Sequence, residues 1–305
     1  MPSAPESAPA RGLLVPALIA LLCAIWGSTW WAIRVCLEHD NQPPLSSAAL
    51  RFLLAGASMA LVAPRLLRLD PKPPPPAWLW LTTGATSFAG SYGVLYVAEQ
   101  VVPSGIAAVL WAIFPLLMAG SGVLVLDERL RARQWLGFLI SFGGIVLVFS
   151  GDLGGGEQAP AGLLGSALLL LLSPVISAAG TTLVKKYGHG TSSVLLNRNG
   201  MLFGALLLGV AAFACESPLA MRWTTGTTIA TLYLALGGTA LTFGVYFWLL
   251  QRVPASRLSL ISYVTPVLAV LLGVAVGDGT ADRYLWLGTG FVVGGVALVV
   301  QRSKR

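Results

Sequence analysis

Residues 103–149, PSGIAAVLWAIFPLLMAGSGVLVLDERLRARQWLGFLISFGGIVLVF, are echoed 151 residues later by PASRLSLISYVTPVLAVLLGVAVGDGTADRYLWLGTGFVVGGVALVV at 254–300. From residue 102 to residue 149, 15 of 48 positions are identical to their counterparts, without a gap. A repeat of this kind at a fixed period indicates a duplicated architecture. Each copy contains two apolar stretches long enough to cross a bilayer, joined by a short polar turn. The sequence therefore predicts a membrane protein made of two related halves.

The composition supports this interpretation. Of 305 residues, 56% are hydrophobic and only 10% are charged, and the mean hydropathy is +0.79. A soluble domain carries about a quarter charged residues, so most of this surface is expected to face lipid. The net charge of +7 would suggest a nucleic-acid partner in a soluble protein. Here the basic residues lie in short loops, so membrane orientation explains them better, and no nucleic-acid partner is expected.

The hydropathy pattern predicts ten spans of about 20 residues each. They cover residues 13–35, 45–63, 78–98, 103–125, 134–150, 162–184, 192–214, 227–250, 254–276 and 284–301. The predicted organisation is a disordered cytoplasmic tail at 1–12, a first five-helix repeat at 13–151, a linker at 152–161, a second five-helix repeat at 162–301 and a cytoplasmic tail at 302–305. The span at 78–98 is rich in Gly, Ser and Thr and is the weakest of the ten.

Charged residues orient these spans. With the N-terminus placed in the cytoplasm, 14 of the 19 Lys and Arg residues fall in cytoplasmic segments. Short loops rich in Lys and Arg stay on the cytoplasmic side. The sequence therefore predicts an inner (plasma) membrane protein with both termini in the cytoplasm. Since each half has five spans, the second half enters the membrane from the opposite side. The predicted fold class is an all-α integral membrane protein with ten transmembrane helices in two inverted five-helix repeats (5+5).

Several short motifs resemble the EamA family of the drug/metabolite transporter superfamily. They are Trp26-Gly27-Ser28, Arg51-Phe52, Pro115 before Asp127-Glu128-Arg129-Leu130, and Gln134-Trp135-Leu136-Gly137. The second copy departs from the pattern, because Gly279-Thr280-Ala281 replaces Glu128-Arg129-Leu130. The resemblance implies a ten-helix transporter, often an exporter of amino acids, other metabolites or toxic compounds, and it leaves the substrate open.

Two arginines lie within spans, where a central Arg costs about 2.5–3.5 kcal/mol on insertion scales. Arg51, in SSAALRF, and Arg198, in SSVLLNRN, occupy places that we match at a displacement of 147 residues. One reading is that they bind a substrate carboxylate or form alternating gate contacts. The other is that they snorkel to the interface or cap helix ends. Asn197 adds amide hydrogen-bonding capacity beside Arg198.

Aromatic residues at helical spacing predict the wall of a substrate cavity, with core packing as the alternative. Tyr92 and Tyr96 are related to Phe243 and Phe247 by the same 151-residue shift. The predicted substrate-binding residues are Trp26, Trp30, Arg51, Tyr92, Tyr96, Trp111, Asn197, Arg198, Phe243, Phe247 and Ser262.

Two prolines, Pro115 and Pro266, lie mid-span and are predicted hinges, because proline removes a helix hydrogen bond. Three GxxxG pairs, Gly200/Gly204, Gly273/Gly277 and Gly290/Gly294, predict close helix packing.

Groups needed for other chemistry are sparse. Asp and Glu lie outside the spans or at their ends, His39 and His189 lie in loops, and Cys23, Cys36 and Cys215 show no CxxC spacing. No P-loop motif is present. We therefore expect no enzyme activity, no catalytic residue, no metal and no cofactor. We expect a facilitator, or a carrier coupled through an atypical group, rather than a carrier with a buried proton-coupling carboxylate or histidine.

The leading hypothesis is a secondary transporter or facilitator that exports small organic metabolites, amino acids among them, by alternating access between inverted repeats. The partners expected are a small-molecule substrate and the lipid bilayer, and a monomer suffices. Three alternatives remain: an exporter of hydrophobic drug-like compounds, an integral membrane enzyme acting on lipids, and a structural or sensory subunit.

Overall fold

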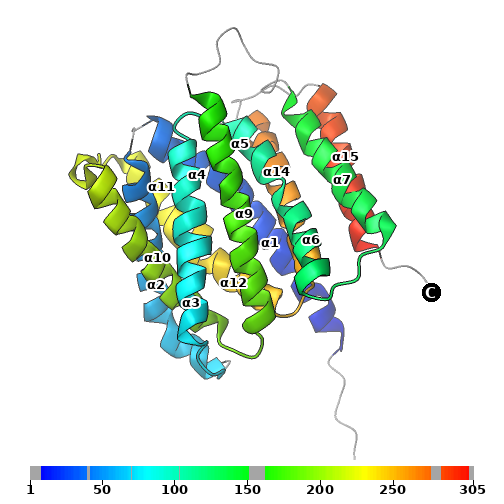
Figure 1. Cartoon of the computed structure of the whole chain (residues 1–305), viewed down its shortest axis with the longest axis horizontal. Coiled ribbons are helices and arrows are strands. Elements are labelled where there is room, and N and C mark those ends of the chain that lie inside the picture. Colours follow the sequence, from blue (N-terminus) through cyan, green and yellow to red (C-terminus); the bar gives the residue numbers. More distant parts are fainter. Residues whose placement is uncertain are drawn as a thin grey trace, which may run out of the picture.

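The structure is a computed structural model, and it describes residues 8–39, 42–69, 71–102, 104–150, 162–275 and 283–301. Helices make up its regular structure (Figure 1). In chain order they are α1 (Ala8–Arg34), η1 (Val35–His39), α2 (Pro44–Leu69), α3 (Ala77–Thr83), η2 (Gly84–Gly90), α4 (Ser91–Ala98), α5 (Ser104–Trp111), α6 (Phe114–Val125), α7 (Ala132–Val148), α9 (Leu163–Tyr187), α10 (Ser193–Cys215), η3 (Pro218–Ala220), α11 (Thr225–Ala235), η4 (Leu236–Leu241), α12 (Thr242–Leu250), α13 (Ala255–Leu258), α14 (Ile261–Ala275) and α15 (Arg283–Val300).

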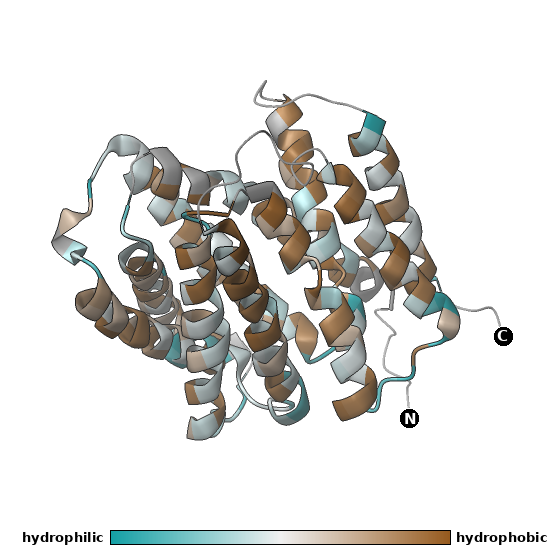
Figure 2. Cartoon of the chain, turned by 45° about the horizontal axis from the view of Figure 1, so that its top comes forward, coloured by the Kyte–Doolittle hydropathy of each residue, from teal (hydrophilic) through white to brown (hydrophobic). Residues whose placement is uncertain are grey.

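Eight helical stretches of the described chain are long and apolar enough to cross a membrane. They are Leu13–Leu37, Pro44–Arg68, Ile106–Val125, Leu163–Tyr187, Ser193–Cys215, Thr225–Leu250, Ala255–Leu272 and Arg283–Val300. Apolar residues cover the shafts of the helices, and many of the most hydrophilic residues lie near helix ends and in connecting segments (Figure 2). The other two predicted spans fall on α7, which has 17 residues, and on the consecutive segments α3, η2 and α4. The chain is therefore an all-helical, multi-pass membrane protein.

The predicted N-terminal tail needs a correction. Helix α1 begins at Ala8, so residues 8–12 are helical rather than disordered. Pro9 lies in the first turn, where proline removes no helix hydrogen bond. The rest of that tail, the linker at 152–161 and the C-terminal tail at 302–305 lie outside the described residues.

Two π-helical segments occur at matching places in the repeat. Adding 151 to Gly84–Gly90, the bounds of η2, gives 235–241, and η4 spans Leu236–Leu241. A π-helix widens one turn and changes which backbone carbonyls are bonded within the helix, and such segments are frequent at functional sites. The weakest predicted span, 78–98, is helical with this irregularity in its centre.

Helices α7 and α15 lie side by side at one edge of the molecule (Figure 1). A Cβ on Gly137 would lie 2.6 Å from the carbonyl oxygen of Gly295, and one on Gly144 would lie 2.7 Å from that of Gly288. The 151-residue shift relates Gly137 to Gly288 and Gly144 to Gly295, so the two contacts exchange under the repeat. Contacts of this reciprocal kind are those that a two-fold relation produces.

The predicted GxxxG contacts are only partly correct. Gly200 and Gly204 pack against Phe88, as expected of a close-packing face. Gly290 and Gly294 have no described atom within 4 Å of a built Cβ, because the packed face of α15 carries Gly288 and Gly295 instead. Helix rotation of about 100° per residue separates these faces. The remaining pair is Gly273/Gly277, and position 277 lies outside the described residues.

Two carboxylates bind the first turns of helices that are distant from them in the sequence. Glu128 accepts from the backbone nitrogen atoms of Ala255 and Ser256, where α13 begins. Glu216 accepts from the backbone nitrogen atoms of Leu45 and Ser46 in the first turn of α2, at 2.7 and 2.9 Å. The first turn of a helix has unsatisfied N–H groups and a positive dipole end, so both contacts fasten one segment to another.

Candidate functional site

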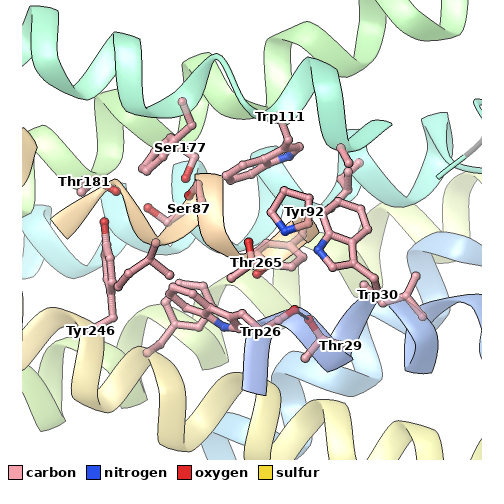
Figure 3. Close-up of a pocket in the computed structure, with 18 of the residues that line it drawn as sticks. Trp26, Thr29, Trp30, Ser87, Tyr92, Trp111, Ser177, Thr181, Tyr246 and Thr265 are labelled. Carbon is pink, nitrogen blue, oxygen red and sulfur yellow. Dashed lines mark hydrogen bonds between the residues drawn. The ribbon is translucent and has the colours of Figure 1, made fainter. Parts of the chain in front are cut away.

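A cavity of about 100 Å³ lies between the helices. By this measure one water needs about 10–15 Å³, so the space holds several waters or a small organic molecule. Its lining residues are Trp26, Thr29, Trp30, Ile33, Arg51, Ser87, Tyr92, Leu95, Ala108, Trp111, Phe114, Ser177, Thr181, Phe243, Tyr246, Phe247, Leu258, Ile261, Ser262, Thr265 and Pro266 (Figure 3). They come from both halves of the chain, and α7, α10 and α15 contribute none of them.

Arg51 on α2 carries the formal charge of this wall. Its side chain is only 2% exposed, so it does not snorkel to an interface. Its Nε donates to the hydroxyl of Thr239 at 2.7 Å, and Nη1 donates to the phenol oxygen of Tyr96 at 3.1 Å. Its Nη2 donates to the carbonyl oxygen of Gly238 at 3.2 Å. These partners are neutral, and two of them belong to the π-helical segment η4.

Aromatic rings surround the guanidinium. Its central carbon lies 4.9 Å from the ring centre of Tyr92, a distance at which the ring face attracts a cation. Tyr92 makes an edge contact with Phe52 at 5.0 Å between ring centres and another with Phe243 at 6.1 Å. The charge therefore sits in a rigid and largely apolar wall.

The two tryptophans placed mid-span both have partners for their ring N–H. Trp26 donates to the carbonyl oxygen of Gly238 at 3.2 Å, the same oxygen that accepts from Arg51. Trp111 donates to the hydroxyl of Ser173 at 3.1 Å, and that hydroxyl donates to the carbonyl oxygen of Ser91 at 2.8 Å. These bonds fix both indoles with part of each ring against the cavity.

Hydroxyl groups form a part of the wall that sequence reasoning missed. Ser177 and Thr181 lie one helical turn apart on α9, and both line the cavity with Ser87 and Tyr246 (Figure 3). The hydroxyl of Ser87 is buried without a hydrogen-bond partner among the described residues, and the phenol of Tyr246 lies within bonding reach of Thr181. A buried polar group without a partner costs free energy, which a ligand or water can recover.

Nine of the thirteen predicted site and hinge residues line the cavity. They are Trp26, Trp30, Arg51, Tyr92, Trp111, Phe243, Phe247, Ser262 and Pro266. Tyr96 lies behind this wall and bonds Arg51. Pro115 is buried in the first turn of α6, directly after the break between α5 and α6, and Pro266 lies inside α14.

Asn197 and Arg198 are outside the cavity wall. Asn197 is fully buried and donates to the carbonyl oxygens of Ser193 and Phe243. Arg198 is half-buried, and its Nε donates to the side chain of the next residue, Asn199. The structure therefore separates Arg198 from the site with which it was grouped.

A second register can match the two halves around Arg51. The preceding serine pairs, Ser46-Ser47 and Ser192-Ser193, align at a shift of 146 rather than 147. That register pairs Arg51 with Asn197, and both of these side chains are buried, at 2% and 0% exposure. A shift of one residue turns a helical side chain by about 100°, which moves Arg198 to another face.

The wall presents groups suited to binding a small molecule. Its described residues comprise aromatic rings, aliphatic groups, hydroxyls and one guanidinium. Such a surface can hold a flat or apolar molecule and fix its polar groups by a few directed bonds.

A family model now identifies the chain. The model of the "EamA-like transporter family" matches residues 14–150 and again residues 164–301. The chain belongs to the EamA-like transporter family. This confirms the resemblance to drug/metabolite transporters seen in the short motifs.

Relatives of the EamA-like family align along most of the chain. The "Uncharacterized inner membrane transporter YedA" of Escherichia coli strain K12 is 34% identical over 292 residues, which is 94% of this chain and 90% of that protein. "Protein PecM" of Dickeya dadantii is 29% identical over 82% of this chain and 80% of its own length. The "Probable amino-acid metabolite efflux pump" of Salmonella typhimurium is 28% identical over 84% and 86%.

One solved crystal structure superposes with a TM-score of 0.79 at 21% identity, covering 94% of this chain and 96% of that chain. At this identity the likeness concerns the fold. The chain is thus a multi-pass membrane protein of a transporter family, similar to proteins named for the inner membrane.

Proposed function

We propose that the chain is a secondary transporter or facilitator that exports small organic metabolites across the inner membrane. The observation that carries the proposal is a cavity lined by residues of both repeats and containing a buried arginine without a carboxylate partner among its described contacts. Secondary transporters bind their substrates near the bilayer midplane, between structural repeats. Family membership and the relatives' names support transport in general.

Alternating access between two inverted repeats of five helices is the mechanism that we propose. Three observations support it: the 151-residue repeat, the π-helical segments at matching positions, and the reciprocal contacts of Gly137 with Gly295 and of Gly144 with Gly288. In this arrangement the termini lie in the cytoplasm, as the distribution of Lys and Arg predicts. Because one chain lines the cavity, a monomer suffices.

Amino acids are the substrate class suggested by the name of one relative, the efflux pump of Salmonella typhimurium. The runner-up is an exporter of hydrophobic drug-like compounds, favoured by the aromatic wall. A membrane enzyme acting on lipids is less well supported, because no Asp, Glu or His lines the cavity within the described ranges.

Counterflow in proteoliposomes tests the proposal. Liposomes loaded with unlabelled compound should take up the labelled compound faster than empty liposomes, with saturation and without need of a pH gradient. Replacing Trp26, which lines the cavity, with alanine should abolish this uptake. Trp286→Ala should preserve it, because the side chain of Trp286 is exposed on α15 and does not line the cavity. Folded protein that exchanges no compound of a broad metabolite and drug panel would refute the transport function.

A further inference from the structure

The charge balance of the cavity is uneven. Arg51 brings one positive charge into the wall, and no Asp or Glu from the described residues lines the same space. Glu99 follows α4 beyond Tyr96 and is not part of the lining. A buried charge is stable only with compensation, which here comes from neutral dipoles and from the ring of Tyr92. An anionic ligand would complete that compensation.

Arg51 also keeps one donor in reserve. A guanidinium has five N–H groups, and the described partners Thr239, Tyr96 and Gly238 take three of them. The phenol of Tyr92 also bonds the guanidinium, so four of the five N–H groups have partners. The remaining N–H suits an oxygen of a carboxylate, and the existing bonds hold the planar group in place.

The remainder of the wall suits an uncharged body. Trp26, Tyr92 and Trp111 present aromatic surface, and Figure 3 shows them projecting into the cavity from different sides. Ser87 adds a hydroxyl without a described partner, which can serve a neutral polar substituent. An ammonium group would find no carboxylate here, and the charge of Arg51 would repel it.

We propose that the cavity selects organic monoanions, meaning a carboxylate on a flat apolar body, over the zwitterionic amino acid of the same skeleton. The inference deepens the proposed function and rests on it for the identity of the cargo. The observation behind it is the guanidinium of Arg51, whose described partners are all neutral, in a cavity that otherwise presents rings and hydroxyls.

Three probes that share a phenyl ring on a two-carbon chain test the proposal. At neutral pH, 3-phenylpropionate is an anion, phenylalanine a zwitterion and phenethylamine a cation. Binding of each to the full chain in lipid nanodiscs is measured by calorimetry. We expect 3-phenylpropionate to bind at least tenfold more tightly than phenylalanine, and phenethylamine to bind most weakly. Equal or tighter binding of phenylalanine, or no binding of any probe, would overturn the proposal.

Variants assign the preference to the guanidinium. Arg51→Gln removes the charge and should abolish the preference, whereas Arg51→Lys keeps the charge and should retain the order of the probes. Arg198→Gln is the matched control, because Arg198 lies in a span but outside the wall, and it should bind as the unaltered protein does. If Arg51→Gln fails to fold, the ranking of the three probes on the unaltered protein still decides the question.

Counterflow of the same probes separates this proposal from the transport function. Tight binding of 3-phenylpropionate without counterflow of any compound would refute transport and leave the ligand class standing. Counterflow of phenylalanine in preference to 3-phenylpropionate would support transport and refute the ligand class.

Discussion

Gly144 on α7 and Gly288 on α15 touch through their backbones. A Cβ built on Gly144 lies 2.7 Å from the carbonyl oxygen of Gly288, and one built on Gly288 lies 2.6 Å from that of Gly144. Only glycine permits two helices to approach this closely. Gly137 and Gly295 repeat the contact two turns away, so the pair is fixed along its length.

Gly144→Ala should destabilise the protein by about 1–3 kcal/mol, because the added methyl group forces the two helices apart. Thermal unfolding of the purified protein in detergent measures the effect. Its neighbour Gly143 supplies the control, since no atom of the described chain lies within 4 Å of a Cβ there. Gly143→Ala should leave the unfolding temperature unchanged or slightly raised. Equal effects of the two substitutions would contradict the packing described for α7 and α15.

Thr239→Val should lower both the stability of the protein and its affinity for the ligand. Valine has the shape of threonine but cannot accept the hydrogen bond from Nε of Arg51, which leaves a buried charged donor without a partner. Such a loss costs about 1–3 kcal/mol. Thr239→Ser keeps the hydroxyl and should recover most of the loss in unfolding temperature and in affinity for 3-phenylpropionate. A serine variant no better than the valine variant would argue against this role of the hydroxyl.

Ser87→Ala should separate binding from stability. The hydroxyl of Ser87 is buried without a described partner, so its removal should leave the unfolding temperature unchanged or higher. Ligand affinity should fall if the substrate uses this group. Ser141 offers the contrast: its hydroxyl donates to the carbonyl oxygen of Val292 away from the cavity. Ser141→Ala should lower the unfolding temperature and spare affinity. The reverse pattern would remove Ser87 from the site.

Glu128→Ala and Glu216→Ala should each destabilise the protein by about 1–2 kcal/mol, since each leaves helix N–H groups without their carboxylate. Unfolding followed by circular dichroism measures both. Asp127→Asn is the control: Asp127 is exposed and has a φ of 54°, a conformation that asparagine also tolerates. Variants of Glu128 and Glu216 that unfold at the temperature of this control would show that the two contacts contribute nothing.

The positions of the helices could be predicted from the sequence. Apolar runs bounded by loops are enough to place α2, α9, α10 and α15. Residues 134–150 also read as a span, although α7 has only 17 residues. The π-helical segments could not be predicted, because Gly84–Gly90 and Leu236–Leu241 have the composition of ordinary membrane helices. The extra residue in such a turn is set by packing against other segments.

The candidate site could be predicted in part. Large aromatic residues and Arg51 are conspicuous in a membrane span, because each is rare or expensive there. Ser177 and Thr181 are not, since hydroxyl residues also serve helix packing, and only their spacing of four on α9 hinted at a shared face. Arg198 was grouped with the site because it is an arginine within a span and matches Arg51 at a shift of 147 residues. The serine pairs before Arg51 and Asn197 align at a shift of 146 instead.

Among the described helices, α7, α10 and α15 contribute no residue to the cavity lining. Substitutions on these helices can therefore raise the stability of the protein with little effect on ligand selectivity. Substitutions on the lining helices can change selectivity with little effect on stability. A library of variants confined to α7 and α15 should yield proteins with a higher unfolding temperature that bind the same substrate. New specificities should come from the helices that enclose the space around Arg51.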